Sequence, residues 1–127
     1  MHWGKRIILV DDNIVNLRMG KILLEKEYSV VTAPSALHLF RLLENKSNVP
    51  DLILLDIDMP GMDGFETIKR LKTNTLTEKI PVIYLSAHSE IQDVHHGFSL
   101  GAVGYIRKPY EPRVLLERIE KILFDMP

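Results

Sequence analysis

The sequence contains no cysteine, so it offers neither a disulfide framework nor thiolate chemistry. No apolar run approaches the roughly 18 residues that a membrane-spanning helix needs. Near the N-terminus only four apolar residues separate Arg6 from Asp11, too few for the core of a signal peptide. These absences predict a cytoplasmic protein with no membrane partner.

An excess of charge of one sign is also lacking. The chain carries 16 basic and 17 acidic residues, for a formal net charge of −1, which argues against direct nucleic-acid binding as the main function. Phosphate-loop and dinucleotide-binding glycine motifs are absent, as are repeats and low-complexity tracts. With 127 residues, 46% of them hydrophobic, we expect one domain over residues 1–127, with a core over about 5–125.

The chain does contain short apolar runs that end in turn or polar residues. Such runs are typical of strands buried on both faces of a parallel sheet. They predict strands at residues 7–10, 29–33, 51–56, 80–85 and 102–106. Apolar residues at helical spacing predict helices at about 14–26, 36–45, 64–72, 89–100 and 112–123.

Capping residues support the helix boundaries. Asn13 and Ser35 are expected N-caps, and Asp63 with Glu66 and Ser89 with Gln92 have the spacing of capping boxes. Five successive strand–helix units predict an α/β fold, a three-layer α/β/α sandwich around a doubly wound parallel sheet with right-handed crossovers.

Polar residues stand where four of the predicted strands end. They are Asp11 and Asp12, Asp56, Ser86 and Lys108. Each alone has a structural explanation, as a capping acid, a loop hydroxyl or a solvated lysine. In a parallel sheet, however, the carboxyl ends of the strands share one edge, so these side chains are expected to converge.

Electrostatics indicates what such a site needs. Carboxylates about 4 Å apart repel by about 4 kcal/mol per pair at an intermediate dielectric, and one lysine cannot offset three of them. A hard divalent cation with oxygen ligands can, and Mg²⁺ typically combines one or two carboxylates with phosphate oxygens. The pattern therefore favours phosphoryl chemistry, with Asp56 as nucleophile and with Lys108 and Ser86 stabilising the transferred group.

At this point the chain resembles a response-regulator receiver domain of the chemotaxis-receiver type from end to end. The matching motifs are Val10-Asp11-Asp12-Asn13, Leu54-Leu55-Asp56, Met59-Pro60-Gly61-Met62-Asp63-Gly64, Leu85-Ser86-Ala87, Gly101-Ala102 and Lys108-Pro109. The resemblance implies a flavodoxin-like (βα)5 fold with strand order 2-1-3-4-5. It also implies a signalling phosphoacceptor rather than an enzyme.

The resemblance further implies that Asp56 accepts a phosphoryl group from the phosphohistidine of a histidine kinase or histidine phosphotransfer protein. The cofactor is expected to be Mg²⁺, or Mn²⁺ in its place. Asp12 and Asp56 are expected to ligate the metal directly and Asp58 through its backbone carbonyl, whereas Asp11 acts through a bound water.

A switch is implied as well. Ser86 is expected to move toward the phosphoryl group and Tyr105 to follow, which changes the surface formed by the predicted helix 89–100, strand 102–106 and helix 112–123. That surface is expected to contact an output domain or downstream protein, and the resemblance allows a homodimer through it. The Lys108–Pro109 peptide bond is expected to be cis.

Two residues depart from the commonest family pattern. Ser86 stands where threonine is more usual, and Asp58 adds an acid two residues after the acceptor. The Asp56-Ile57-Asp58 sequence leaves open a phosphatase like the haloacid dehalogenases, with Asp58 as general acid. A degenerate receiver used only for protein interaction is the second alternative.

Overall fold

The protein, in a computed structural model that describes residues 4–59, 63–87 and 91–124, contains one parallel sheet of five strands in the order β2-β1-β3-β4-β5. The strands are β1 (Arg6–Val10), β2 (Ser29–Ala33), β3 (Leu52–Asp56), β4 (Val82–Ser86) and β5 (Gly104–Arg107). The α-helices are α1 (Ile14–Leu24), α2 (Ala36–Glu44), α3 (Gly64–Thr73), α4 (Ile91–Ser99) and α5 (Pro112–Phe124). The predicted α/β sandwich and strand order are confirmed.

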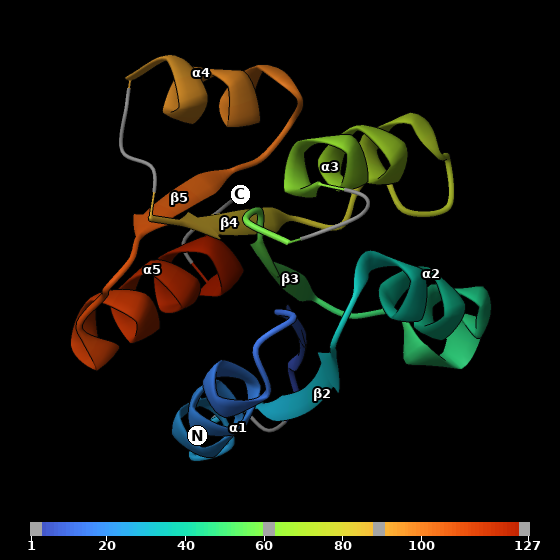
Figure 1. The fold of residues 1–127 in the computed structure, drawn as a ribbon. Coiled ribbons are helices and arrows are strands. Elements are labelled where there is room, and N and C mark those ends of the chain that lie inside the picture. The colour runs from blue at the N-terminus through green and yellow to red at the C-terminus, as the bar shows by residue number, and fades with distance from the viewer. Residues whose placement is uncertain (1–3, 60–62, 88–90, 125–127) are drawn as a thin grey trace.

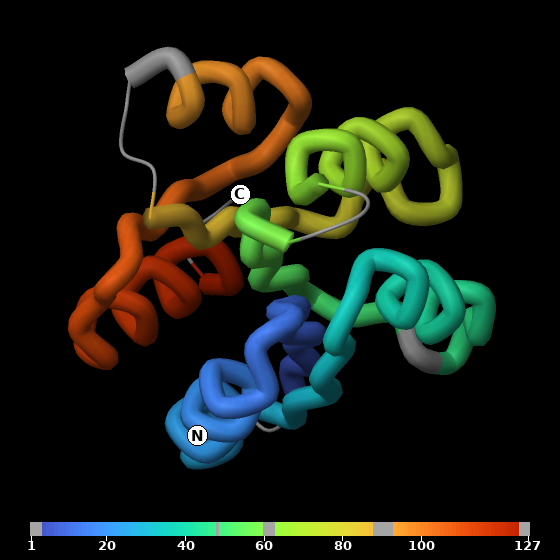
Figure 2. The backbone as a smooth tube through the Cα atoms, viewed as in Figure 1, coloured from blue at the N-terminus to red at the C-terminus, as the bar shows by residue number. Residues whose placement is uncertain are grey.

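Helices cover both faces of the sheet. α1 and α5 lie on one face, and α2, α3 and α4 lie on the other (Figure 1). The backbone runs from β1 out to β2 at one edge, and then returns past β1 to β3, β4 and β5 (Figure 2). All five residues of β3 and all five of β4 are buried, which explains why these strands are almost continuously apolar.

A hydrophobic core lies on each face. On the α1/α5 side, Leu17 and Leu24 pack with Leu115 and Ile119 over the sheet. On the other side the buried residues include Leu39, Ile68, Leu71 and Tyr84. These two cores hold the central strands rigidly. The residues at the carboxyl ends of these strands therefore have a fixed support.

Side-chain caps define three helix starts as the sequence predicts. The backbone N–H of Asn16 donates to the Asn13 side chain at 3.0 Å, and that of Glu66 donates to Asp63 at 2.8 Å. Ser35 caps α2 in the same way. Gly101 follows α4 with φ of 113°, a left-handed conformation that favours glycine. The predicted cap Ser89 lies outside the described residues.

Some strand and helix boundaries in the structure differ by one or two residues from those predicted from the sequence. β4 begins at Val82 because Pro81 cannot donate to the ladder, although its carbonyl accepts a hydrogen bond from Ile53 N at 3.0 Å. β5 begins at Gly104, later than predicted, and continues to Arg107. A short 3₁₀ helix, η1 (Lys46–Asn48), follows α2 and was not predicted. None of the helices in the described residues has the length and apolar character of a membrane span.

Candidate functional site

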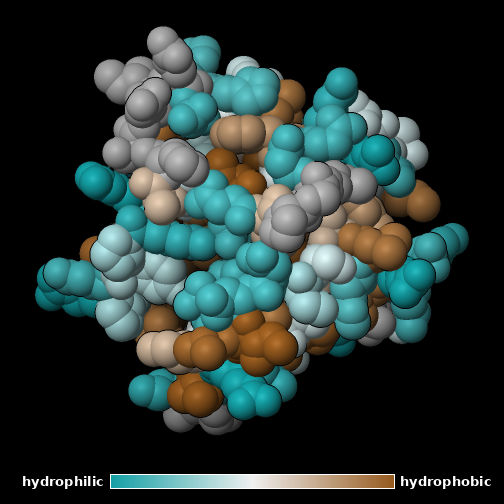
Figure 3. Space-filling model, viewed as in Figure 1, coloured by the Kyte–Doolittle hydropathy of each residue, from teal (hydrophilic) through white to brown (hydrophobic). Residues whose placement is uncertain are grey.

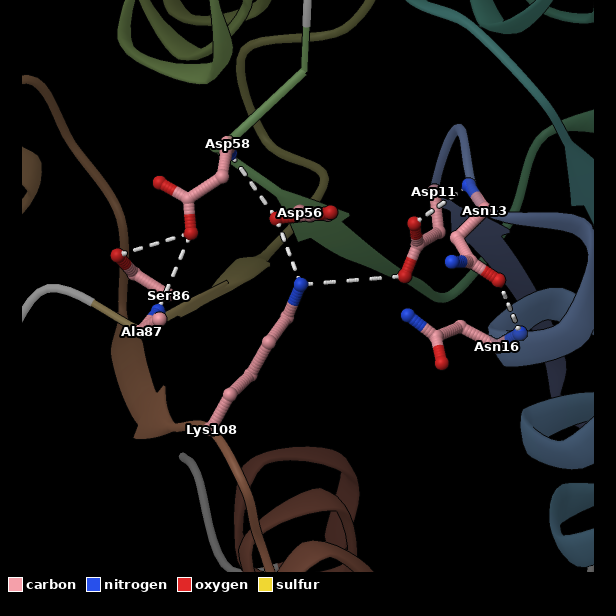
Figure 4. A network of polar contacts seen from close by, with 8 residues as sticks. All are labelled: Asp11, Asn13, Asn16, Asp56, Asp58, Ser86, Ala87 and Lys108. Carbon is pink, nitrogen blue, oxygen red and sulfur yellow. Dashed lines mark hydrogen bonds and ion pairs between the residues drawn. The ribbon is translucent and has the colours of Figure 1, made fainter.

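The parallel register brings the predicted polar residues to one edge of the sheet. Asp56 is the last residue of β3 and Ser86 the last of β4, and Asp56 pairs in register with Leu85 beside it. Asp11 follows β1 directly and Lys108 follows β5. The side chains of Asp11, Asp56 and Lys108 point toward one another (Figure 4). The predicted convergence therefore occurs, and the converging residues come from four different segments of the chain.

Lys108 connects the two buried acids. Its Nζ atom lies 2.9 Å from Asp56 Oδ1 and 3.9 Å from Asp11 Oδ2. The backbone N–H of Lys108 donates to the carbonyl of Ser86 at 2.9 Å, which fixes the start of this segment against β4. The Lys108–Pro109 peptide bond is cis. The ammonium group is thus held close to the carboxylate of Asp56, which the sequence predicts to be the nucleophile.

Three carboxylates at this edge could hold a metal ion. One oxygen from each of Asp11, Asp12 and Asp56 lies within 4.8 Å of the others. Asp11 and Asp56 are buried, with exposed fractions of 4% and 3%, whereas Asp12 is exposed. The donors are all hard oxygens, and in the described part of the chain three carboxylates face the ammonium of Lys108. This donor set and its charge fit a divalent cation such as Mg²⁺.

The pKa of Asp11 supports this interpretation. Burial, and to a lesser extent the negative charge of Asp56, raise the pKa of Asp11, which moves from 3.8 to about 6 in total. The N–H of Asn13, which donates to Asp11 Oδ1 at 2.9 Å, and the ammonium of Lys108 act in the opposite direction. The effects that raise the pKa prevail, so the negative charge of Asp11 is only partly compensated by the protein's own groups.

Asp58 lies two residues after Asp56, but its side chain turns away from the acid cluster. Its backbone N–H donates to Asp56 Oδ1 at 2.9 Å. Its carboxylate lies on the β4 side, where the N–H of Ala87 donates to Oδ2 at 3.1 Å and the hydroxyl of Ser86 approaches the same oxygen at 3.4 Å (Figure 4). The sequence did not predict a role for Ala87, because a backbone amide leaves no signature in residue type.

Tyr105 lies one strand away on β5, paired in register with Tyr84 of β4. The two ring centroids are 5.1 Å apart, and Tyr105 is half-buried. Because side chains alternate along a strand, Ser86 projects from the same face of β4 as Tyr84. Burial raises the pKa of the Tyr105 phenol, and the negative charge of Asp58 raises it further, while Arg107 lowers it. Tyr105 thus lies on the face toward which Ser86 projects.

An open cleft extends from Asp11 over α1. Its volume is about 740 Å³, and its lining includes Asp11 and Lys108 together with Met19 and Ile22 of α1. The exposed apolar residues of α1 are Ile14, Val15, Met19 and Ile22, each at least 62% exposed. The space-filling view shows hydrophobic surface over α1 beside a hydrophilic band (Figure 3). The sequence predicted only the buried side of this helix, and this exposed patch was not predicted.

Comparisons with known proteins agree with the fold. Residues 7–120 match the family described as the response regulator receiver domain. The chain is 37% identical over 121 residues to the phosphate regulon transcriptional regulatory protein PhoB of Pseudomonas aeruginosa, covering 94% of this chain and 52% of that protein. The chain thus spans about half the length of this relative.

Solved structures show the same likeness. A CheY-like receiver domain protein from Methanospirillum hungatei superposes with a TM-score of 0.86 at 32% identity, covering 95% of this chain and 94% of that chain. A structure described as the BeF3-activated DrrB receiver domain superposes with a TM-score of 0.82 at 28% identity, covering 97% and 98% of the two chains.

Proposed function

Because the chain belongs to the response regulator receiver domain family of two-component signalling, we propose that Asp56 accepts a phosphoryl group from a phosphohistidine on a partner protein. The observation that carries this proposal is the position of the Asp56 carboxylate. It is buried at the end of β3, 2.9 Å from the Lys108 ammonium and within an acid cluster suited to a cation. We propose that residues 1–127 form one such domain, in the cytoplasm.

The proposed step is an in-line displacement at phosphorus. A carboxylate oxygen of Asp56 forms the new P–O bond as the P–N bond to the histidine of the donor breaks. The bonding electrons return to the imidazole nitrogen, which regains a proton. Lys108 neutralises negative charge on the acceptor and on the transferred group, and the Ser86 hydroxyl donates to a phosphoryl oxygen.

We propose that Asp12 and Asp56 hold Mg²⁺, or Mn²⁺, together with the backbone carbonyl of Asp58, while Asp11 acts through a water molecule. The bound cation supplies charge neutralisation at the phosphoryl oxygens. The raised pKa of Asp11, to about 6, supports the need for a positive charge at this point.

The exposed apolar surface of α1 suggests where the phosphohistidine partner docks. A donor histidine must approach Asp56 from the open edge of the sheet, and the cleft that includes Asp11 and Lys108 continues to Met19 and Ile22. We propose that a helical face of a histidine kinase or phosphotransfer protein packs on this surface.

We propose that phosphorylation is transmitted through Ser86 and Tyr105 to the face formed by α4, β5 and α5. An output domain, a downstream protein or a second copy of the chain would contact this face. The pairing of Tyr105 with Tyr84, two residues before Ser86, provides a short path between the site and this face.

The test is Mg²⁺-dependent labelling by a small phosphodonor, such as acetyl phosphate, of the wild-type chain and of Asp56→Asn. We expect one phosphoryl group per wild-type chain and none on the variant. Equal labelling of both would refute the assignment of the acceptor. Labelling of the wild type with no effect of Asp56→Asn on partner binding would favour the alternative in which the domain is used only for protein interaction.

A further inference from the structure

The carboxylate of Asp58 occupies a small anion-binding site at the end of β4. The N–H of Ala87 donates to Asp58 Oδ2 at 3.1 Å, which is an ordinary hydrogen-bond length, and the hydroxyl of Ser86 approaches the same oxygen at a longer 3.4 Å. Two donors that converge on one charged oxygen are a favourable arrangement for an anion. In this structure that anion belongs to the protein itself.

This anion site lies directly beside the acceptor carboxylate. The backbone N–H of Asp58 donates to Asp56 Oδ1 at 2.9 Å, so Asp58 is tied to Asp56 through its main chain and to β4 through its side chain. In the close-up, the Asp58 carboxylate lies on the Ser86–Ala87 side of Asp56, whereas Asp11 lies on the opposite side (Figure 4).

We propose that Asp58 is an internal competitor for the hydrogen-bond donors that the phosphoryl group uses. The proposal rests on the proposed function, because it requires that Asp56 carry the phosphoryl group. Once that group is present, its anionic oxygens lie next to Ser86 and Ala87, whose donors then serve either these oxygens or the Asp58 carboxylate. The phosphoryl oxygens and the Asp58 carboxylate are both negatively charged and repel each other when they approach the same donors. Phosphorylation therefore displaces the Asp58 side chain.

Two consequences follow for the equilibrium between the free and the phosphorylated forms. The unphosphorylated form is stabilised, because its donors already have an anionic partner. Phosphorylation, or the binding of a phosphoryl mimic, must first release that partner. Asp58 is therefore a positioning residue that sets how readily the site accepts an anion, and it takes no part in bond making.

Variants at this position separate competition from a structural role. Asp58 is exposed, so its substitution is not expected to prevent folding. Asp58→Ala removes the competing acceptor and its charge, whereas Asp58→Asn keeps an amide oxygen that can still accept from Ala87. As a matched control, Glu66→Gln neutralises an acid on α3 whose carboxylate pairs with Arg70 at 3.3 Å.

The experiment uses the whole chain and two measurements. Amide NMR spectra follow the binding of beryllofluoride in the presence of Mg²⁺, and labelling by acetyl phosphate gives the initial rate at Asp56. We expect Asp58→Ala to lower the beryllofluoride midpoint and to raise the labelling rate by roughly three- to tenfold. Asp58→Asn should be intermediate, and Glu66→Gln should match the wild type.

The free variants provide a readout that does not depend on phosphorylation. In the absence of beryllofluoride, Asp58→Ala should move the Ala87 amide proton resonance upfield, because the hydrogen bond to Oδ2 is lost, whereas Glu66→Gln should leave it in place. An unchanged Ala87 resonance in Asp58→Ala would overturn the proposed contact.

The remaining outcomes are distinguishable. Unchanged or weaker beryllofluoride binding by Asp58→Ala, with Asp56 still labelled, would refute the competition and leave the proposed function standing. A wild-type chain that neither binds beryllofluoride nor becomes labelled would overturn the proposed function, and this proposal with it.

Discussion

Asp11 holds its proton more tightly in the folded chain than an ordinary aspartate does, because burial and the neighbouring Asp56 disfavour its charged form. Its pKa rises from 3.8 to about 6. Between these values the folded state binds more protons than the unfolded state, so the free energy of unfolding falls as pH rises through this window. The loss persists at neutral pH and is on the order of 2–3 kcal/mol for this group alone.

This predicts that Asp11→Asn stabilises the metal-free protein. The amide is uncharged and its oxygen can still accept from the N–H of Asn13. With chelator present, we expect the variant to exceed the wild type by about 1–3 kcal/mol near pH 7, and the difference to shrink toward about pH 4. Urea unfolding at a series of pH values measures this directly.

Asp12→Asn is the matched control, since Asp12 belongs to the same acid cluster but is exposed. Comparing variants with the wild type at each pH also cancels the contributions of the other carboxylates. A gain for Asp11→Asn that does not change with pH would show that burial of the charge is not its cause.

At the scale of single elements, α4 lies close against the ring of Tyr84. The phenol of Tyr84 donates to the carbonyl of Val94 at 2.6 Å, and a Cβ atom added at Gly97 would lie 2.4 Å from the ring. The ring is almost fully buried, so it cannot move aside without disturbing the core. The glycine therefore permits this close approach of helix and strand two residues before Ser86.

We predict that Gly97→Ala destabilises the protein by about 1–2 kcal/mol. Overpacking costs about 1–3 kcal/mol, and the better helix propensity of alanine returns up to about 1 kcal/mol. Gly20→Ala is the control in α1, because its new Cβ would meet the flexible end of Leu9 at 2.6 Å. Urea unfolding should give a lower free energy of unfolding for Gly97→Ala than for Gly20→Ala. The reverse order would mean that α4 shifts freely over Tyr84.

The sequence predicted most elements because their signals are local. Asn13, Ser35 and Asp63 cap helices through bonds to residues three positions later, so their effect can be inferred from spacing alone. Strand ends carry a weaker local signal, since the pairing partner decides them. β5 extends to Arg107 because this residue pairs with Ser86 of β4, and nothing in the neighbouring sequence indicates that register.

The site could be predicted to the level of residue type but not of contact. Strand ends placed Asp56, Ser86 and Lys108 at one edge. The direction of the Asp58 side chain, however, depends on an N–H of Ala87 that any residue except proline would supply. The exposed patch on α1 did leave a signal, because apolar residues occur on both sides of this helix, as in helices that contact a partner.

At the scale of the whole molecule, Asp11 and Lys108, which lie beside Asp56, share one cleft with the exposed surface of α1. The cleft of about 740 Å³ that includes Asp11 and Lys108 also includes Ile22, whose side chain is 66% exposed. A partner that delivers a phosphoryl group to Asp56 would cover this region, whereas a small phosphodonor needs only the open edge of the sheet. Docking and chemistry can therefore be separated by the choice of donor.

We predict that Ile22→Asp lowers phosphotransfer from an autophosphorylated histidine kinase that labels the wild-type chain by roughly tenfold or more, because a charge is placed in an apolar interface. Labelling by acetyl phosphate should not change. Leu37→Asp is the matched control, since this residue is 59% exposed but lies on α2, on the other face of the sheet. If both variants slow the kinase equally, α1 is not the docking surface. If Ile22→Asp also slows acetyl phosphate, the change has reached the site itself.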